Sequence, residues 1–433
     1  MNRVKSPLFP KSYKTALLGI FLVALTLRLI FVFYYETRQE SYWGSADLQY
    51  DQIATHIATG KGYYAGDYFE GLGQFYFGKE KLYSIRSPLY PYLLAALYIL
   101  FGRSVLGIGI FQALMSSLII FSYFYIGRRV FGNKIGLVAA LAVALYPYSI
   151  FHDIRVFDTV LFEFFLGLLI VSILRLVEKP TWKNGVVSGV LMGLAANSRL
   201  FFFTFSTFFF LFLLLQFRGE FKKSVKLFLI VFLSQILVLA PWIVRNYSIH
   251  HTFLLSIDGG WNFFLGNNRL TMEQMQNRRE MDETVKELRK ELPKNLMRLK
   301  EAEIDQLFYK KGLEFIKNHP AEFFKLLWIK TLGLWGFYLN PSGNNFWKNL
   351  IYSLSYGSIL FLSIPGILLS FKEREKYYFF YFLFFYFTIS YIPFITLSRY
   401  RKPLDPYLIM FGLYGVIHFY QKFSGQKISR KKD

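Results

Sequence analysis

The sequence predicts an all-α polytopic membrane protein with about ten transmembrane helices. Apolar residue types make up 54% of its 433 residues, and it contains 50 Phe and 31 Tyr. Several apolar runs reach about 18 residues, the length that a helix needs to cross the hydrocarbon core. The formal net charge is +22, and much of it falls in short loops between these runs, a pattern typical of cytoplasmic loops in membrane proteins. These observations exclude a soluble globular protein, and the positive charge requires no nucleic-acid partner.

The N-terminal segment predicts an uncleaved signal anchor. The basic stretch MNRVKSPLFPKSYK precedes an apolar run at 15–34 that lacks a clear small-residue cleavage site. The basic residues place the N-terminus in the cytoplasm. Arg28 lies inside this first span, so we expect it to face protein or a watery cavity and not lipid. The chain has no cysteine, which excludes disulfides and thiolate metal sites.

The first external loop, 35–104, carries an acid-bearing segment, SYWGSADLQYDQIATHIATGKGY, at 41–63. Asp47 and Asp51 are four residues apart and share one face of a helix, with Tyr50 beside them. The spacing predicts a short amphipathic helix on the membrane surface that ends at GKG. A solvated acidic face is the alternative interpretation. The apolar run 88–101 is short for a crossing and contains two prolines, which favours an interfacial or re-entrant helix.

The remaining spans follow in order, with both termini in the cytoplasm. The run 185–217 makes two crossings interrupted only at Asn197-Ser198-Arg199. The segment 245–345 is predicted to be an external helical region with breaks at Pro293 and at His319-Pro320. We therefore divide the chain into an N-terminal transmembrane module (1–245), an external region (246–345) and C-terminal transmembrane helices with a cytoplasmic tail (346–433). The other predicted spans are 105–126, 135–151, 159–176, 227–244, 347–371, 377–397 and 405–421.

Charged and polar residues gather at the outer ends of these spans. One interpretation is a structural network of ion pairs, and the other is a site that uses acids for chemistry and arginines for an anionic, membrane-resident substrate such as a lipid phosphate. No nucleotide-binding fingerprint, HExxH motif or metal-ligand spacing of histidines competes with these interpretations. The residues are Asp47, Asp51, Arg86, Asp153, Arg155, Asp158, Arg199, Arg245, Asn246, Arg399 and Arg401.

Several segments together resemble a known family. SADLQYDQIATHIATGKGY, RSPLYPYLLAALYILFG and RRVFGNKIGLVAALAVALYP are similar to signatures of bacterial membrane glycosyltransferases of the dolichyl-phosphate-mannose protein mannosyltransferase superfamily. GLAANSR, PWIVRNY with GGWNFFLGNN, and SRYRKPLDP resemble three further signatures in the expected order. This superfamily has glycosyltransferase fold type C (GT-C) and includes the aminoarabinose transferases of lipid A. The resemblance covers nearly the whole chain except 270–330.

The resemblance implies an inverting enzyme that transfers a sugar from a polyprenyl-phosphate donor at the outer face of the inner membrane. The acceptor would be lipid A, another glycolipid, a polysaccharide or a protein. Such a transfer passes through an oxocarbenium-like state, in which a carboxylate removes the acceptor proton while the phosphate leaves. Arginines that hold the phosphate charge would make protonation of the leaving group unnecessary.

The resemblance also assigns roles to residues of this chain. Asp47 maps to the first-loop aspartate of the family, which serves as general base or as an orienter of the acceptor. Independently of the resemblance, we take Asp51 as the alternative base and Tyr50 as a positioning group. Asp158 falls where the family more often carries Glu, and would contact the acceptor or a metal. Some members use a divalent cation, so Mg or Mn is the candidate cofactor, with Asp47 and Asp158 as its candidate ligands. The candidate donor-phosphate binders are Arg199, Arg245, Arg399, Arg401 and Arg86, the last of which can also brace the loop by pairing with an aspartate.

Two other functions remain open at this point. A transporter or flippase of a lipid-linked sugar also needs arginines near lipid phosphate, but predicts charged residues along a path through the midplane and often repeated halves. An enzyme resembling the O-antigen polymerases or ligases shares arginine-rich external loops, but would not be expected to carry an acidic first loop. Dependence on a carboxylate therefore separates this third possibility from the transferase.

Overall fold

The computed structural model describes residues 11–37, 45–66, 81–277, 296–339 and 346–424, together with single positions between 284 and 292. The predicted all-α class is confirmed, since helices make up almost all of the regular structure in these ranges. Two-residue strands, β1 (Ala65–Gly66) and β2 (Lys81–Leu82), pair antiparallel in the first external loop.

Five helices are long and apolar enough to cross a membrane, and the bent pair α6 and α7, with a 59° angle between them, makes a sixth candidate. Shorter apolar helices cover 89–101, 200–216 and 378–391, and the predicted count of about ten spans is not confirmed by length and composition. The protein is therefore a multi-pass membrane protein. The candidate spans are α1 (Lys11–Glu36), α5 (Val105–Val130), α6 (Asn133–Leu145) with α7 (Pro147–Asp153), α8 (Thr159–Glu178), α11 (Phe221–His250) and α17 (Phe346–Ser370) extended by a 3-10 segment (Phe371–Lys376).

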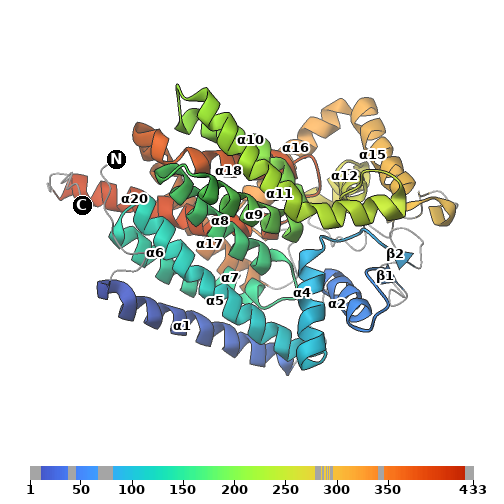
Figure 1. The fold of residues 1–433 in the computed structure, drawn as a ribbon, viewed down its shortest axis with the longest axis horizontal. Coiled ribbons are helices and arrows are strands. Elements are labelled where there is room, and N and C mark those ends of the chain that lie inside the picture. The colour runs from blue at the N-terminus through green and yellow to red at the C-terminus, as the bar shows by residue number, and fades with distance from the viewer. Residues whose placement is uncertain are drawn as a thin grey trace.

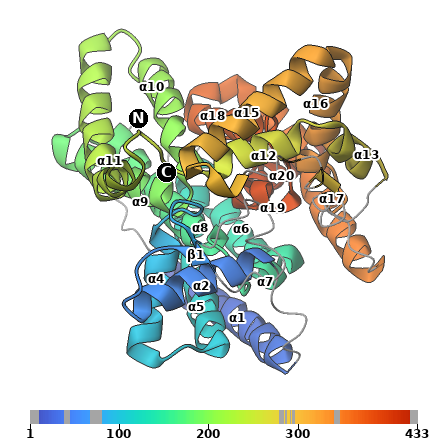
Figure 2. The ribbon, with the colours of Figure 1, turned by 90° about the vertical axis from the view of Figure 1, so that its right-hand side faces the viewer.

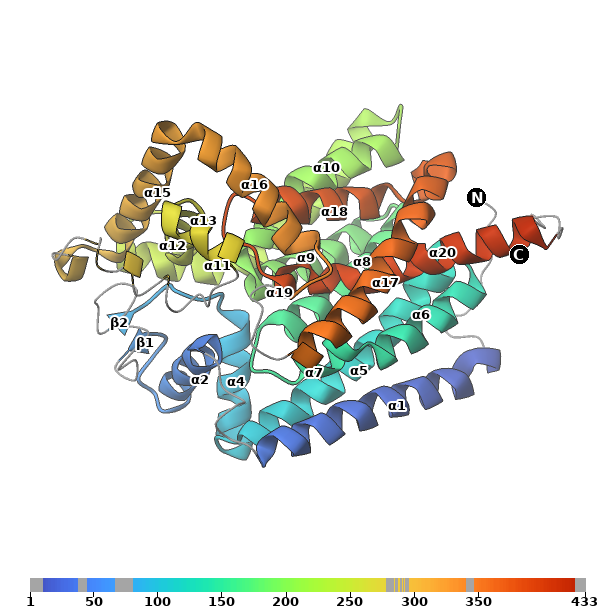
Figure 3. The same ribbon diagram turned by 180° about the vertical axis from the view of Figure 1, so that it is seen from behind.

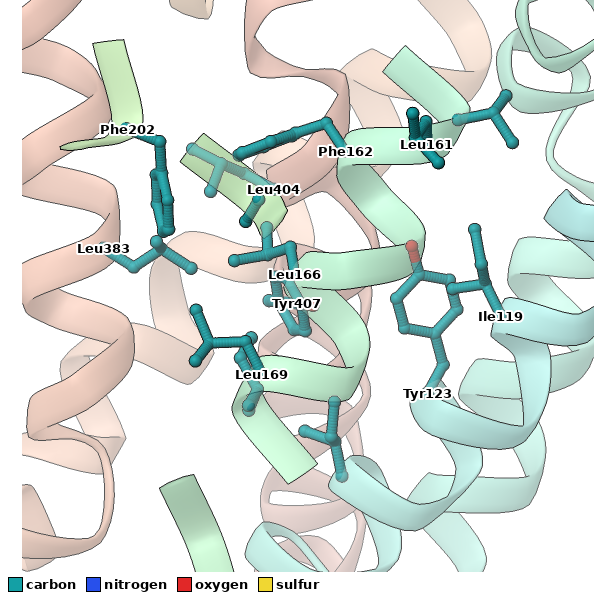
Figure 4. Packing of buried hydrophobic residues seen from close by; sticks show 14 of the residues in the cluster. Ile119, Tyr123, Leu161, Phe162, Leu166, Leu169, Phe202, Leu383, Leu404 and Tyr407 are labelled. Carbon is teal, nitrogen blue, oxygen red and sulfur yellow. The ribbon is translucent and has the colours of Figure 1, made fainter. Parts of the chain in front are cut away.

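The helical bundle is built around α8, which packs against α5 on one side and α9 (Trp182–Ser198) on the other. A 3-10 turn (Leu200–Thr204) and α10 (Phe205–Gln216) follow α9, so the predicted break at Arg199 falls where α9 ends. Figure 4 shows Phe162, Leu166 and Leu169 of α8 among side chains from several neighbouring helices, which form one continuous apolar core. α1 lies along the edge of the bundle (Figure 1).

The C-terminal part closes the bundle. α18 (Tyr378–Tyr391) packs against α10, and α20 (Asp405–Phe423) packs against α17 and α6. α17 and α20 touch at small residues: a Cβ on Gly366 would lie 1.8 Å from the carbonyl oxygen of Phe411. Small residues at such crossings allow backbones to approach closely, as is common where helices pack inside membranes.

The elements of the segments predicted to be external, here called the external elements, gather at one end of the bundle, opposite the end where α1 begins and α20 finishes (Figure 1). Seen from that end, α2 (Ser45–Ala58) lies below and α12 (Asp258–Gly266) above, with α19 (Ser398–Arg401) and α8 between them (Figure 2). α4 (Leu89–Phe101) runs across the direction of α5, as expected for an interfacial helix (Figure 1). The external region also contains α13 (Arg269–Asn277), a 3-10 turn (Leu296–Arg298), α15 (Glu301–Asn318) and α16 (Pro320–Trp335).

Local sequence signals explain the ends of several external elements. α2 ends before Gly60 and Gly62, whose φ values of +74° and +93° lie in the left-handed region that glycine adopts without strain. The predicted break at His319-Pro320 separates α15 from α16, with Pro320 in the first turn of α16. A second apolar core joins α2 and the β-hairpin to α12 and α15. This core fixes the external elements against the ends of the spans.

Candidate functional site

Asp158 and Arg199 meet where α8 begins and α9 ends, at the end of the bundle that also holds α2 and α12. Asp158 directly precedes the first turn of α8, where the helix dipole favours a carboxylate, and Arg199 directly follows α9. Arg199 Nη2 donates to Asp158 Oδ1 at 3.0 Å and to Thr159 Oγ1 at 2.6 Å. Burial disfavours the charge of Arg199, but attraction to Asp158 outweighs it and raises the pKa of the guanidinium. Its other terminal nitrogen, Nη1, is buried and has no hydrogen-bond partner in the described part of the chain.

Arg399 adds a second guanidinium beside this pair. Its Cζ lies 4.6 Å from the centroid of the Phe157 ring and 5.5 Å from that of Tyr400. Phe157 precedes Asp158 in the chain, so this contact places Arg399 next to the Asp158–Arg199 pair. Within the described ranges, no ion pair with a carboxylate is found for Arg399. Aromatic faces therefore hold Arg399, and its N–H groups are not used on an acid.

α16 holds the segment that carries Arg399 on both sides of that residue. Before Arg399, Thr396 Oγ1 donates to the carbonyl oxygen of Lys330 at 3.1 Å. After it, Arg401 Nη1 donates to the carbonyl oxygen of Leu334, one helical turn further along α16, at 2.9 Å. These two bonds make the position of Arg399 depend on the position of α16.

α2 brings Tyr50 to the same place. Asp158, Arg86, Arg199 and Arg399 are the charged groups close enough to influence the Tyr50 phenol electrostatically. Burial is the main effect and raises the pKa of Tyr50, so the phenol stays protonated and can donate a hydrogen bond.

Arg86 braces the loop, as one of the two sequence interpretations expected. It donates from Nε to Gln49 Oε1 at 2.7 Å and pairs through Nη1 with Asp258 Oδ2 at 3.1 Å. Its Cζ lies 5.5 Å from the centroid of the Tyr50 ring. Asp258, at the start of α12, is a site neighbour that the sequence analysis did not single out.

Of the two aspartates in the first loop, Asp51 has a side chain whose partners the structure describes, and Asp47 is described by its backbone alone. Asp51 accepts two bonds from Arg103, from Nε at 3.0 Å and from Nη2 at 2.8 Å, and a third from the Tyr98 hydroxyl at 2.7 Å. This carboxylate is committed to joining α2 to the end of α4. Asp47 belongs to the first turn of α2 by its backbone, and its side chain lies outside the described residues.

Two of the predicted phosphate binders are engaged by protein groups. Arg245 donates to the carbonyl oxygens of Tyr63 and Tyr83 at 2.8 and 2.9 Å, and so ties the end of α11 to the β-hairpin. Arg401 is fully buried and pairs with Asp405 at 2.9 Å, while its guanidinium lies 3.2 Å from the centroid of the Tyr356 ring. The structure therefore brings Arg199, Arg399 and Arg86 together around Asp158 and Tyr50, and uses Arg245 and Arg401 elsewhere.

A buried cluster of four charges, here called the four-charge network, lies beside this site: Arg28, Asp153, Glu163 and Lys402. Arg28 donates to Asp153 Oδ2 from Nε and Nη2 at 3.0 and 2.8 Å, which confirms that this residue faces protein. Lys402 Nζ lies 2.5 Å from Asp153 Oδ1 and donates to both Glu163 oxygens at 2.7 and 2.8 Å. The only sequence signals for Glu163 and Lys402 are a lone acid in an apolar span and a lysine in the motif that includes Arg399.

The described residues contain no group of three or more His, Asp or Glu side chains placed to hold a metal ion. Asp158, one of the two candidate ligands, already pairs with Arg199, and the Asp47 side chain is not described. A divalent cation at Asp47 and Asp158 therefore stays a prediction of the family resemblance.

The family described as dolichyl-phosphate-mannose-protein mannosyltransferase matches residues 86–244. No curated protein matches the sequence significantly.

Among solved structures, the chain is similar to the archaeal oligosaccharyltransferase AglB from Archaeoglobus fulgidus in complex with an inhibitory peptide and a dolichol-phosphate. The TM-score is 0.56 at 15% identity, and the match covers 98% of this chain and 52% of AglB. The apo form of that enzyme gives a TM-score of 0.57 at 15% identity, with 98% and 53% of the two chains covered. ArnT from Cupriavidus metallidurans bound to undecaprenyl phosphate gives a TM-score of 0.37 at 13% identity, with 97% and 81% covered. The chain thus spans about half the length of AglB.

Proposed function

We propose that the chain is a GT-C glycosyltransferase and that it transfers a sugar, with inversion, from a polyprenyl-phosphate donor to a cell-envelope acceptor. The observation that carries this proposal is an incompletely used pair of cations. Arg199 has a buried nitrogen with no partner in the described chain, and Arg399 beside it is held by aromatic rings. Such a place favours an added anion, and a lipid phosphate supplies one at membrane depth.

The donor phosphate binds between Arg199 and Arg399. Guanidinium groups bind phosphate oxygens through pairs of N–H donors and stay charged at any physiological pH. As the bond from the anomeric carbon to the phosphate oxygen breaks, negative charge grows on that oxygen, and these preorganised cations stabilise it. Asp158 keeps Arg199 in its orientation, because the pair fixes one edge of the guanidinium. The GT-C fold of AglB, whose complex contains dolichol-phosphate, supports a phosphate-bearing lipid as the ligand.

The acceptor side of the reaction belongs to α2. Asp47 stands one helical turn before Tyr50 on that helix, and the Tyr50 ring lies against Arg86. We assign to Asp47 the removal of the proton from the acceptor hydroxyl. The freed oxygen then attacks the anomeric carbon on the face opposite the phosphate, which inverts its configuration. The Tyr50 phenol donates a hydrogen bond that positions sugar or acceptor.

We place this site on the external side of the inner membrane, with both termini in the cytoplasm. The support is the positive charge of the short loops at the opposite end of the spans. The flippase interpretation receives no comparable support, since Arg28 and Glu163, which lie within predicted spans, are paired with Asp153 and Lys402 and do not line a path.

Two measurements test the proposal. Undecaprenyl phosphate added to the detergent-solubilised protein should raise its apparent unfolding temperature, and undecaprenol, which lacks the phosphate, should not. Arg199→Ala and Arg399→Ala should abolish the difference, while Arg218→Ala, at an exposed arginine in the loop between α10 and α11, should keep it. Equal responses to both lipids would contradict the proposal.

A mass-resolved comparison of cell-envelope glycans with and without the gene then identifies the reaction. Loss of one sugar substituent names donor and acceptor together, whether the acceptor is lipid A, another glycolipid, a polysaccharide or a protein. Unchanged glycans under conditions where the protein is produced would count against a transferase.

A further inference from the structure

α16, in a region that the sequence predicts to be soluble, has two distinct faces. Leu326, Lys330 and Leu334 are buried against the rest of the protein. Phe324, Trp328 and Leu332, four residues apart on the opposite face, are 68%, 65% and 41% exposed. This spacing makes a continuous apolar stripe along the outside of the helix. Soluble surfaces seldom expose large aromatic residues in such a row.

The C-terminal end of α16, next to Leu332 of the stripe, is bonded to two of the membrane helices. The Tyr356 hydroxyl of α17 donates to the carbonyl oxygen of Trp335, at the end of α16, at 3.3 Å. Trp335 Nε1 donates to Thr388 Oγ1 of α18 at 3.1 Å. Figure 3 shows α16 running toward α19 and α17 on the face of the molecule turned to the viewer. Beyond α16, the exposed large apolar side chains continue through Phe337 and then along α17 with Phe346, Trp347, Ile351 and Leu354.

We propose that α16 is seated in the bilayer interface, at the end of the spans where Arg399 lies, with its apolar stripe in contact with lipid. Its 16 residues are about 24 Å long, which is short for a crossing, so the helix lies in the interface and does not span. Trp328 is the residue type enriched at the boundary between headgroups and acyl chains. The exposed Lys325 beside it can reach headgroup phosphates.

This seating gives α16 a role in the site. Thr396 and Arg401, on either side of Arg399, are bonded to backbone carbonyls of α16. A helix fixed at the interface therefore sets Arg399 at the depth of a lipid phosphate. This consequence rests on the proposed function, whereas the contact with lipid does not.

The absence of cysteine from the chain allows a direct test in the full-length protein. Single cysteines replace Phe324 and Trp328 on the stripe, Gln306 on an exposed position of α15, and Phe361 on the exposed side of α17. Each is labelled with an environment-sensitive fluorophore in phosphatidylcholine liposomes. Lipids that carry a nitroxide near the headgroup or deep in the acyl chain quench the fluorescence of labels in contact with the membrane. Iodide quenches the fluorescence of labels exposed to water.

We expect the labels at 324 and 328 to be quenched several-fold more by the shallow nitroxide lipid than the label at 306, and to be protected from iodide. The label at 361 should respond most to the deep nitroxide. Labels at 324 and 328 that behave like the one at 306 would overturn the proposal. Labels shielded from lipid and iodide alike would also overturn it, because a second copy of the chain would then cover the stripe. Neither outcome bears on whether the protein binds undecaprenyl phosphate.

Discussion

Arg199 meets Asp158 through a single nitrogen, Nη2, at 3.0 Å, and its other terminal nitrogen is buried without a hydrogen-bond partner in the described chain. Buried donors are rarely left in this state, because an unmade hydrogen bond costs about 1–3 kcal/mol. Under the proposed function this nitrogen binds the donor phosphate, and variants at the site should separate phosphate binding from catalysis.

Asp158→Asn should retain or increase affinity for undecaprenyl phosphate while sugar transfer falls by about a hundredfold or more. The amide removes the anion that competes with phosphate for Arg199, and it loosens the orientation of the guanidinium during the reaction. Titration of ligand-dependent stabilisation gives the affinity, and radiolabelled sugar transfer in membranes gives the rate. Loss of phosphate binding together with transfer would show that Asp158 holds the ligand directly, for example through a metal.

Arg399→Ala and Arg401→Ala should have different effects, although only Tyr400 separates the two residues. Arg399 has no acid partner in the described ranges, so its loss should change the free energy of unfolding by less than about 0.5 kcal/mol. Phosphate affinity should fall by about ten- to a hundredfold, the value of a charge-assisted hydrogen bond. Arg401→Ala leaves the buried Asp405 without its ion-pair partner, which should lower the free energy of unfolding by about 3–5 kcal/mol. Thermal unfolding and lipid titration measure the two quantities, and a destabilised Arg399→Ala protein would refute the assignment.

Asp47→Asn and Asp51→Asn should also differ. Asp51 is held by Arg103 and Tyr98, so its amide variant should be less stable by about 1–3 kcal/mol and lose activity through unfolding. Asp47→Asn should keep the stability of the parent protein and lose transfer. Thermal unfolding in detergent, paired with the transfer assay, distinguishes the two cases. Full transfer by the Asp47 variant would assign the base to another group.

The titration of Asp305 should make the stability of the external region depend on pH. Asp305 accepts the Gly260 N–H at 2.6 Å, and burial nevertheless raises its pKa to about 6. An ordinary aspartate has a pKa of about 3.9 in the unfolded chain, so between about pH 4 and 6 the folded state binds more protons. The contribution of Asp305 to stability therefore declines as pH rises through this window, by on the order of 2–3 kcal/mol in all.

The measurement for Asp305 is the apparent unfolding temperature at several pH values between 4 and 7. Asp305→Asn should flatten the dependence, because the amide oxygen still accepts from Gly260 but does not titrate. The exposed Glu314→Gln on the same helix should leave the slope as in the parent. If Asp305→Asn leaves the change of unfolding temperature with pH as in the parent, another group is responsible for the titration.

Much of the fold was predictable because hydropathy and charge act locally. The break at Arg199, the amphipathic helix at 45–58 and the buried position of Arg28 all follow from short stretches of sequence. The number of spans was harder to predict, since the helices at 200–216 and 378–391 are shorter than a bilayer requires. Burial between neighbouring helices allows such segments, and single-sequence patterns do not reveal it.

The candidate site was only partly predictable, because the partners of each arginine come from distant segments. Arg245 and Arg399 look alike in sequence, but the β-hairpin supplies two carbonyl oxygens to the first, and Phe157 supplies an aromatic face to the second. The position of α16, which fixes the segment around Arg399, likewise depends on tertiary packing. The sequence therefore indicated which end of the spans carries the chemistry, but not which of its cations are available.

The four-charge network constrains how the protein is made. Its members reach the membrane at very different times during synthesis, since Lys402 follows Glu163 by 239 residues. Until translation delivers that lysine, the inserted helices hold two carboxylates and one guanidinium, an uncompensated negative charge that lipid tolerates poorly. The nascent bundle must stay open to water or bound by insertion factors until its last helix arrives. Chains that end before this helix should consequently be recognised and degraded by membrane proteases.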